Sequence, residues 1–465
     1  MAIKRLGKQT VVLQSPPTIA GFASVAGEME GAGPLKDTFD YISDDSHFGE
    51  KTWEKAESAM LKRCFGIACD KAGTVPSELD YIFSGDLLNQ CMGSAIAMKD
   101  TGAPYFGLYG ACSTMAESLA LASMAIDGGF ADTACALTSS HFCSSERQYR
   151  FPLEYGGVRA PTAQWTVTGS GAAVLRSHGA GPYITHITTG RITDAGITDS
   201  ANMGAAMAPA AYSTLKAHFS ETGRDPFYYD AIVTGDLGML GHDLLQSFFR
   251  AGGVELGVMY MDCGMLIYDV KTQDVHAGGS GSGCSASVLC GHLLRGMSRG
   301  VWNRILFAAT GALLSPTSSQ QGDSIPGICH AVSIENNCPD ERGNKNANIS
   351  GVPESLRRGR RSLRRRRVPH RQDQTDAGQD SVSVRGGWRC AGRCRDIRSF
   401  DRFCRGRCLC ASDRLRQSAG QGSASGRGGE GRAGCLYRWL YRCFRRHMRR
   451  HFLRFPGRAH LQAAG

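Results

Sequence analysis

A repeated pattern, in which a short apolar strand ends in Gly-Asp, constrains the fold of this chain more than any other feature. Residues 80–87 read Asp-Tyr-Ile-Phe-Ser-Gly-Asp-Leu, and residues 230–237 read Asp-Ala-Ile-Val-Thr-Gly-Asp-Leu. Each segment is rich in β-branched and aromatic residues, which predicts a buried parallel strand that leads into a loop. The two copies therefore predict a chain built from two related halves.

A second pair of segments supports this duplication. Cys112 in Gly-Ala-Cys-Ser-Thr matches Cys284 in Ser-Gly-Cys-Ser-Ala, and the strands that follow reach Thr138 and Thr310 at the same offset. The repeats predict an α/β fold in which β-α-β-α occurs twice, with parallel-rich sheets and covering helices. We expect the first half to span residues 1–180 and the second half to span residues 181–338.

The chain changes character near residue 338. About 31 of its 53 Lys and Arg residues, but only about 10 of its 42 Asp and Glu residues, lie beyond this point. The formal charge of +11 therefore comes from the tail, and the body before it is acidic. An acidic body argues against nucleic acid as a partner. The body also has no apolar stretch long enough to predict a transmembrane segment of its own.

Cys112 is the most informative candidate for a functional site. A strand that begins near Pro104 turns at Gly110, and a helix begins near Ser113, so Cys112 is expected at a helix N-terminus. Backbone N–H groups and the helix dipole at such a position favour a thiolate and lower the thiol pKa. This geometry suits a nucleophile or an anion-binding site, and the alternative is a buried Cys that only packs.

Several longer strings match a known family in order along the chain. They include Gly7-Lys-Gln-Thr10, Gly85-Asp-Leu-Leu-Asn-Gln90, Phe106-Gly-Leu-Tyr-Gly-Ala-Cys-Ser-Thr114, Thr138-Ser-Ser-His141, Glu146-Arg-Gln-Tyr-Arg150, Thr166-Val-Thr-Gly-Ser-Gly171 and Met203-Gly-Ala-Ala-Met-Ala-Pro-Ala-Ala211. On these strings, residues 4–336 resemble the stage V sporulation protein AD family. The duplicated halves likewise resemble the thiolase-like fold of thiolases and ketoacyl synthases.

The resemblance implies both a fold and a function. The fold is an α-β-α-β-α sandwich, and the function is binding of dipicolinic acid, or its calcium complex, within the SpoVA channel of the spore inner membrane. Such a protein acts in uptake during sporulation and in release at germination. Its partners would be dipicolinic acid and the other SpoVA membrane proteins, with peripheral membrane association. Thiolase-like enzymes are commonly dimers, so a homodimer is a possible assembly.

The alternative function is an acyltransferase of the thiolase or ketoacyl-synthase type that uses Cys112. Such enzymes need a His, and a second His or Asn, in the second half of the chain. Here the strand before Asp236 is followed by no adjacent His: His242 lies in an expected helix, and His276 lies on an expected strand. We therefore expect a binding protein with no confident catalytic residue. A scaffold that only docks membrane proteins is the third hypothesis.

The expected ligand is a planar dicarboxylate, which needs donors at both ends and an apolar slot. The inserted segment 139–161 is expected to form loops over the pocket. Arg147 is an alternative contact in that insert, because Arg suits bidentate contacts to carboxylates. Asp86 and Asp236 either cap turns or contact a calcium ion carried by the ligand; no other cofactor or resident metal is expected. The predicted ligand-binding residues are Cys112, Ser113, His141, Arg150, Met203, Asp86, Asp236 and Gly283.

The Arg-rich tail, residues 339–465, allows three interpretations. It could be a disordered arm that binds RNA or anionic lipid, or a Cys-rich zinc module with irregular spacing. Arg-, Gly- and Cys-rich sequence with almost no Lys is also what GC-rich DNA encodes in a wrong reading frame. This third interpretation predicts a frameshift near codons 336–350 and a tail without an evolved fold.

Overall fold

The computed structural model describes residues 3–149 and 159–337, and its strands form two groups with the same internal arrangement. The strand order is β5-β4-β6-β8-β2 in the first group and β11-β10-β13-β14-β9 in the second. In each group the first two pairings are parallel and the last two are antiparallel. The predicted duplication is thus present, and each half is a mixed sheet in which the expected parallel strands are completed by two antiparallel ones.

The bounds of these strands place the two Gly-Asp segments at equivalent positions. The first group consists of β5 (Tyr105–Leu108), β4 (Tyr81–Gly85), β6 (Thr133–Ser140), β8 (Gly169–Arg176) and β2 (Thr18–Ala26). The second consists of β11 (Tyr260–Asp262), β10 (Ala231–Thr234), β13 (Arg304–Ala312), β14 (Gly327–Glu335) and β9 (Tyr183–Thr188). The groups are joined through one residue pair between β2 and β9, Thr18 with Tyr183.

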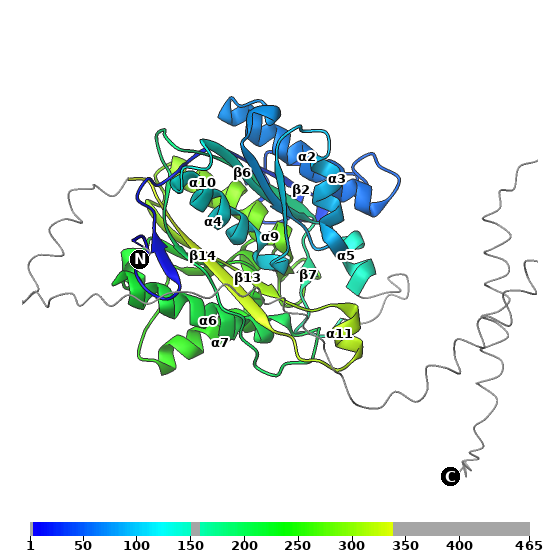
Figure 1. The fold of residues 1–465 in the computed structure, drawn as a ribbon. Coiled ribbons are helices and arrows are strands. Elements are labelled where there is room, and N and C mark those ends of the chain that lie inside the picture. Colours follow the sequence, from blue (N-terminus) through cyan, green and yellow to red (C-terminus); the bar gives the residue numbers. More distant parts are fainter. Residues whose placement is uncertain (1–2, 150–158, 338–465) are drawn as a thin grey trace, which may run out of the picture. The chain divides into compact units, whose positions relative to one another are not determined.

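Helices cover both groups of strands and also separate them, as Figure 1 shows. Helices α2 (Trp53–Ala72) and α3 (Met92–Met98) lie on the outside of the first half, and α6 (Met203–Thr222) and α7 (Gly238–Ala251) lie on the outside of the second. Between them, α4 (Thr114–Asp127) packs on β4 and β6 on one side and on β13 and β14 on the other, next to α9 (Ser282–Val288). The five layers expected for a thiolase-like α/β fold are therefore present.

The sequence of α4 explains why this helix occupies the middle layer. Its buried residues include Thr114, Met115, Ala116 and Ala120, which face different directions around the helix axis. A helix that is apolar nearly all round belongs in a core rather than at a surface. Small residues such as Ala116 let the two sheets approach it closely.

The remaining elements are short and mostly connect or flank the sheets. They are β1 (Thr10–Val12), α1 (Glu28–Gly31), β3 (Tyr41–Ile42), α5 (Phe142–Tyr149), β7 (Trp165–Thr166), α8 (Cys263–Leu266), β12 (Gly279–Ser280), α10 (Leu294–Ser298) and α11 (Pro316–Gln320). Within residues 3–149 and 159–337, no helix combines the length and apolar character needed to cross a membrane. Arg150 and the tail at 339–465, with the predictions made for them, lie outside the described residues.

Candidate functional site

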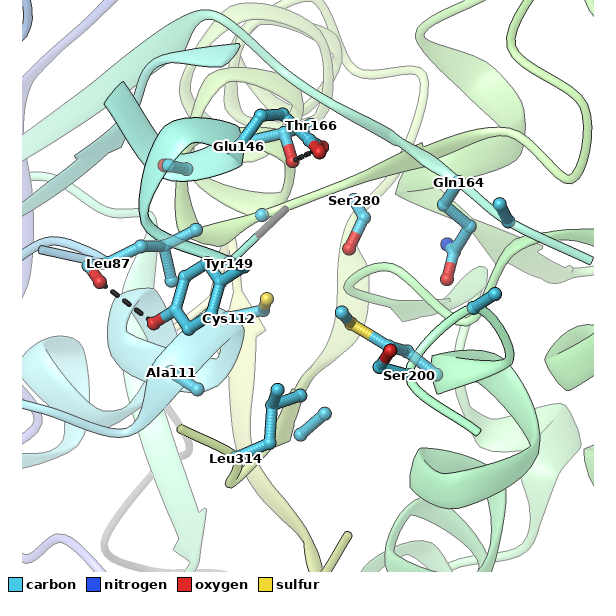
Figure 2. Close-up of a pocket in the computed structure, with 16 residues that line it drawn as sticks. Leu87, Ala111, Cys112, Glu146, Tyr149, Gln164, Thr166, Ser200, Ser280 and Leu314 are labelled. Carbon is cyan, nitrogen blue, oxygen red and sulfur yellow. Dashed lines mark hydrogen bonds between the residues drawn. The ribbon is translucent and has the colours of Figure 1, made fainter. Parts of the chain in front are cut away.

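A pocket opens where the turn before α4, helix α5 and the start of α6 meet, and Cys112 lies in its wall (Figure 2). Its empty volume of about 650 Å³ includes part of the open mouth. The lining residues are Leu87, Ala111, Cys112, Ser145, Glu146, Tyr149, Ala163, Gln164, Thr166, Ser200, Ala201, Met203, Ser280, Gly281, Ala312 and Leu314.

The turn that presents Cys112 has an unusual backbone. Cys112 belongs to a short 3₁₀ turn, Ala111–Ser113, and Ala111 has a φ of 50°, in the left-handed region that non-glycine residues rarely adopt. Such strained residues persist only where the surrounding structure holds them, and they gather at functional sites. The predicted turn between strand and helix is therefore confirmed, and it places the Cys112 side chain at the pocket.

Asp236 lies behind the pocket wall and organises it. Its carboxylate accepts hydrogen bonds from Thr310 Oγ1 at 2.8 Å, Ser280 Oγ at 2.9 Å and the Gly281 backbone N–H at 3.1 Å. The Cys112 thiol also donates to this carboxylate. Asp236 itself is fully buried and does not line the pocket, so it acts on a ligand only through the groups that it holds.

This environment keeps the Cys112 thiol protonated, contrary to the thiolate that a helix N-terminus predicts. Burial raises the pKa of the Cys112 thiol well above its ordinary value, and the nearby Asp236 carboxylate raises it further. The neighbouring Gly281 and Ser280 polar groups lower it by less. Desolvation and a neighbouring negative charge both disfavour the thiolate, and here they outweigh the N-terminal turn.

We expect Cys112 to alkylate slowly for this reason. At pH 7.5, iodoacetamide should modify Cys112 at least about tenfold more slowly than free cysteine, because each pKa unit leaves tenfold less thiolate. The rate should keep rising beyond pH 9. Peptide mass spectrometry gives the rate at each Cys, with the partly exposed Cys143 as an internal comparison. If Cys112 were modified as fast as free cysteine, the raised pKa assigned to its thiol would be wrong.

Several residues that were predicted to contact the ligand form hydrogen bonds within the protein and do not line the pocket. Ser113 is buried and donates to the Gly110 carbonyl at 2.7 Å. His141 contacts the Ser46 carbonyl at 2.7 Å through Nε2 and accepts from the Cys143 backbone N–H through Nδ1. Both are structural residues here, because their polar atoms are used within the fold.

Asp86 and Gly283 also have structural roles. Asp86 accepts hydrogen bonds from the Leu88 and Ser94 backbone N–H groups and from Ser94 Oγ, so it caps the turn into α3. A Cβ atom at Gly283 would lie 2.2 Å from the Gly169 carbonyl oxygen, so this glycine permits close packing. Its neighbours Ser280 and Gly281 line the pocket in its place.

The described basic residues considered in the sequence analysis also contact other parts of the protein and do not line the pocket. Arg147 pairs with Glu54 on α2. His242 lies on α7, as predicted, with its ring stacked 4.4 Å from that of Tyr260. His276 was predicted to lie on a strand, and this prediction is wrong. It lies in a turn with a φ of 51°, where it pairs with Asp274. Of the predicted ligand contacts that the structure describes, Cys112 and Met203 line the pocket, and Asp236 supports it.

The sequence interpretation missed the face of α5 that covers the pocket. Tyr149 donates its hydroxyl to the Leu87 carbonyl at 3.0 Å, and its oxygen lies 2.8 Å from the Tyr109 hydroxyl. Glu146 accepts a hydrogen bond from Thr166 Oγ1 at 2.9 Å. Both belong to the segment 146–150, which also contains Arg147 and Arg150. Helical spacing applied to this segment predicts that Tyr149 shares a face with Ser145 and that Glu146 shares one with Phe142.

The described lining is uncharged apart from one carboxylate. It contains Glu146 but no Lys, Arg or His among the residues that the structure places around the pocket. In the same described part of the chain, no group of three or more His, Cys, Asp and Glu side chains is arranged to hold a metal ion. Hydroxyl, amide and thiol groups therefore supply most of the polar contacts.

Fold and site together define a thiolase-like α/β protein whose pocket Cys is paired with Asp236. Among solved structures, the chain is similar to 3-oxoacyl-[acyl-carrier-protein] synthase III from Aquifex aeolicus VF5, with 12% identity over 69% of this chain and 99% of that chain and a TM-score of 0.45. It is also similar to the synthase III of Pseudomonas aeruginosa PAO1, with 14% identity over 70% of this chain and 98% of that chain and a TM-score of 0.38.

Sequence comparison identifies the family. Residues 7–335 match the model of stage V sporulation protein AD. The chain is also 42% identical, over 333 residues, to the stage V sporulation protein AD of Bacillus subtilis (strain 168), a match that covers 72% of this chain and 98% of that protein. The chain therefore belongs to the stage V sporulation protein AD family, a family of sporulation proteins, which confirms the resemblance seen in its sequence.

Proposed function

We propose that the pocket binds dipicolinate, pyridine-2,6-dicarboxylate, and that the protein is the dipicolinate-binding component of the SpoVA channel of the spore inner membrane. It would act in dipicolinate uptake during sporulation and in release at germination. One observation carries the choice of binding over catalysis: the described pocket lining places neither a His nor an Asn side chain with Cys112, whose acidic neighbour is Asp236. Membership of a sporulation family supports the biological setting.

The pocket offers the two kinds of contact that a planar dicarboxylate needs. Leu87, Met203 and Leu314 supply apolar surface for the ring, and Tyr149 adds an aromatic side chain. Hydroxyl groups occur on separate walls, that of Ser145 on α5 and that of Ser200 before α6, while the Ser280 hydroxyl at the end of β12 already donates to Asp236. Polar groups that converge on an apolar pocket fix the orientation of a ligand.

A calcium ion carried by the ligand would suit the oxygen groups of this lining. The residues around the pocket include Ser145, Ser200, Ser280 and Glu146, whose side chains all end in oxygen atoms. Calcium prefers oxygen ligands, including carboxylates, so the calcium complex would find suitable ligands in this lining. We therefore propose that calcium strengthens dipicolinate binding without being a resident cofactor.

The acyltransferase alternative gains no support from the arrangement around Cys112. A condensing enzyme activates its Cys by a base that takes the thiol proton. Here the group paired with the thiol is a carboxylate that raises its pKa, and the described pocket lining contains neither His nor Asn.

We propose that membrane attachment is peripheral and occurs through the other SpoVA proteins.

Thermal unfolding of the full-length protein separates these functions. Millimolar dipicolinate should raise the Tm by several degrees, because a ligand at about 100 times its Kd adds about 2.7 kcal/mol of stability. Benzene-1,3-dicarboxylate, which lacks the ring nitrogen, should raise it less. The proposal is wrong if dipicolinate leaves the Tm unchanged, and acyl-CoA turnover that disappears in Cys112→Ala would establish the enzyme instead.

A further inference from the structure

Ser145 is one of the residues that line the pocket, and its hydroxyl has no hydrogen-bond partner within the described part of the chain. The residue is only 1% exposed. Buried hydroxyl groups are normally hydrogen-bonded, so each exception needs an explanation. Among the described Ser and Thr hydroxyls that are buried without a partner, Ser145 alone lines the pocket, which points to a ligand as its partner.

Helix α5 is held on both sides of this hydroxyl. At its first turn, Ser144 Oγ donates to Glu57 Oε2 on α2 at 2.6 Å. At its last described residue, Tyr149 is held by the Leu87 carbonyl, and the Tyr149 hydroxyl accepts from Tyr109 because its own proton is used by Leu87. The helix that carries Ser145 is therefore held in place before a ligand arrives, and preorganised groups lose less entropy on binding.

The spacing along α5 matches recognition of an aromatic acid. Ser145 and Tyr149 are four residues apart, so they lie on the same face of the helix, and both line the pocket. A hydroxyl and an aromatic ring on one face can contact a carboxylate and the ring that bears it. The turn at Cys112, by contrast, has its thiol proton already directed at Asp236.

We propose that the Ser145 hydroxyl donates a hydrogen bond to one carboxylate of the ligand, and that α5 is the specificity-determining element of the pocket. This inference rests on the proposed dipicolinate-binding function and assigns a contact within it. Ser145 is a ligand-binding residue in this account, and Tyr109 and Glu57 are positioning residues that act through α5.

Ser145→Ala in the full-length protein tests the contact by calorimetric titration with dipicolinate. We expect the affinity to fall by about tenfold or more, as for loss of a hydrogen bond to a charged group. The Tm without ligand should not fall, because no bond within the protein is lost. Ser123→Ala is the matched control: its hydroxyl is also fully buried without a partner, but it lies on α4 away from the pocket, so the affinity should stay within about twofold.

The outcomes separate this inference from the proposed function. Wild-type binding with an unchanged affinity in Ser145→Ala overturns the Ser145 contact and leaves dipicolinate binding standing. Equal losses of affinity in Ser145→Ala and Ser123→Ala also overturn it, because the effect would then not be local to the pocket. A folded wild-type protein that does not bind dipicolinate removes both.

Discussion

Asp236→Asn is expected to weaken dipicolinate binding by the folded protein by about 10- to 100-fold. Asp236 accepts hydrogen bonds from Ser280 and Gly281, which line the pocket, and from Thr310 behind it. An Asn side chain has one carbonyl oxygen in place of two carboxylate oxygens, so some of these donors must lose their acceptor. A buried donor left unsatisfied costs about 1–3 kcal/mol, and the loop after β12 would shift to recover a partner.

The internal duplication provides a matched control for this substitution. Asp86 ends the equivalent strand segment of the first half, is equally buried, and accepts three hydrogen bonds, from Leu88 and Ser94. Neither Asp86 nor its donors Leu88 and Ser94 line the pocket. Asp86→Asn should therefore lower the Tm by an amount comparable to Asp236→Asn while leaving the affinity of the folded protein within about twofold.

Titration of both variants at a temperature where each is folded distinguishes loss of stability from loss of the site. Asp236→Asn should also speed alkylation of Cys112, because it removes a negative charge that raises the thiol pKa. Equal affinities for the two variants would contradict the role assigned to Asp236. An unchanged alkylation rate would show that burial alone protects the thiol.

Glu335→Gln should lower the free energy of unfolding by more than substitution of an exposed acidic residue does. Glu335 is the last residue of β14, and its carboxylate lies 2.8 Å from the Arg224 guanidinium, with only 7% of its side chain exposed. Tyr228 and Thr185 also donate to it, at 2.9 and 2.6 Å. Removing one partner of a buried ion pair leaves the other charge uncompensated, which costs about 3–5 kcal/mol.

An exposed ion pair in the same half provides the comparison. Arg250 and Glu255 are 3.3 Å apart, with 60% and 63% of their side chains exposed, so Glu255→Gln should cost less than about 1 kcal/mol. Urea unfolding of both variants at pH 7 measures the difference. Equal midpoints for Glu335→Gln and Glu255→Gln would show that the Glu335 cluster does not anchor the end of β14.

The pH dependence of this effect has a definite sign. Burial acts to raise the pKa of Glu335, but the Arg224 charge and the hydrogen bonds outweigh it and leave the pKa below the ordinary 4.5. A carboxyl group with a lowered pKa stabilises the fold above its unfolded-state pKa, and that contribution is lost as the pH falls through the folded-state pKa. The gap between wild type and Glu335→Gln should therefore narrow below pH 4.5.

The sequence predicted the repeated part of the fold well. The Gly-Asp segments form β4 and β10 at equivalent positions, and the strands that reach Thr138 and Thr310 are β6 and β13. The antiparallel strands β8, β2, β14 and β9 were not anticipated, because strand pairing depends on partners far apart in the chain. Their apolar runs, buried on both faces, do not reveal direction.

The site was predicted only in part, because sequence spacing does not show where a side chain points or which other protein groups bind it. Ser113 and His141 were predicted to contact the ligand, but their polar atoms turn to nearby carbonyl groups, which no spacing rule reveals. Arg147 was selected because the expected ligand is an anion, yet it pairs with Glu54. Selection by charge also passed over Ser145 and Tyr149, whose importance comes from burial and from the helix face that they share.

Calorimetric titration of dipicolinate into the full-length protein, with and without calcium, tests the central claim most directly. The account predicts heat that fits one site per chain, tighter binding when calcium is present, and displacement of neither form by acyl-CoA. No heat from a protein shown to be folded, together with no retention of dipicolinate in equilibrium dialysis, would contradict the claim that this pocket is a dipicolinate site.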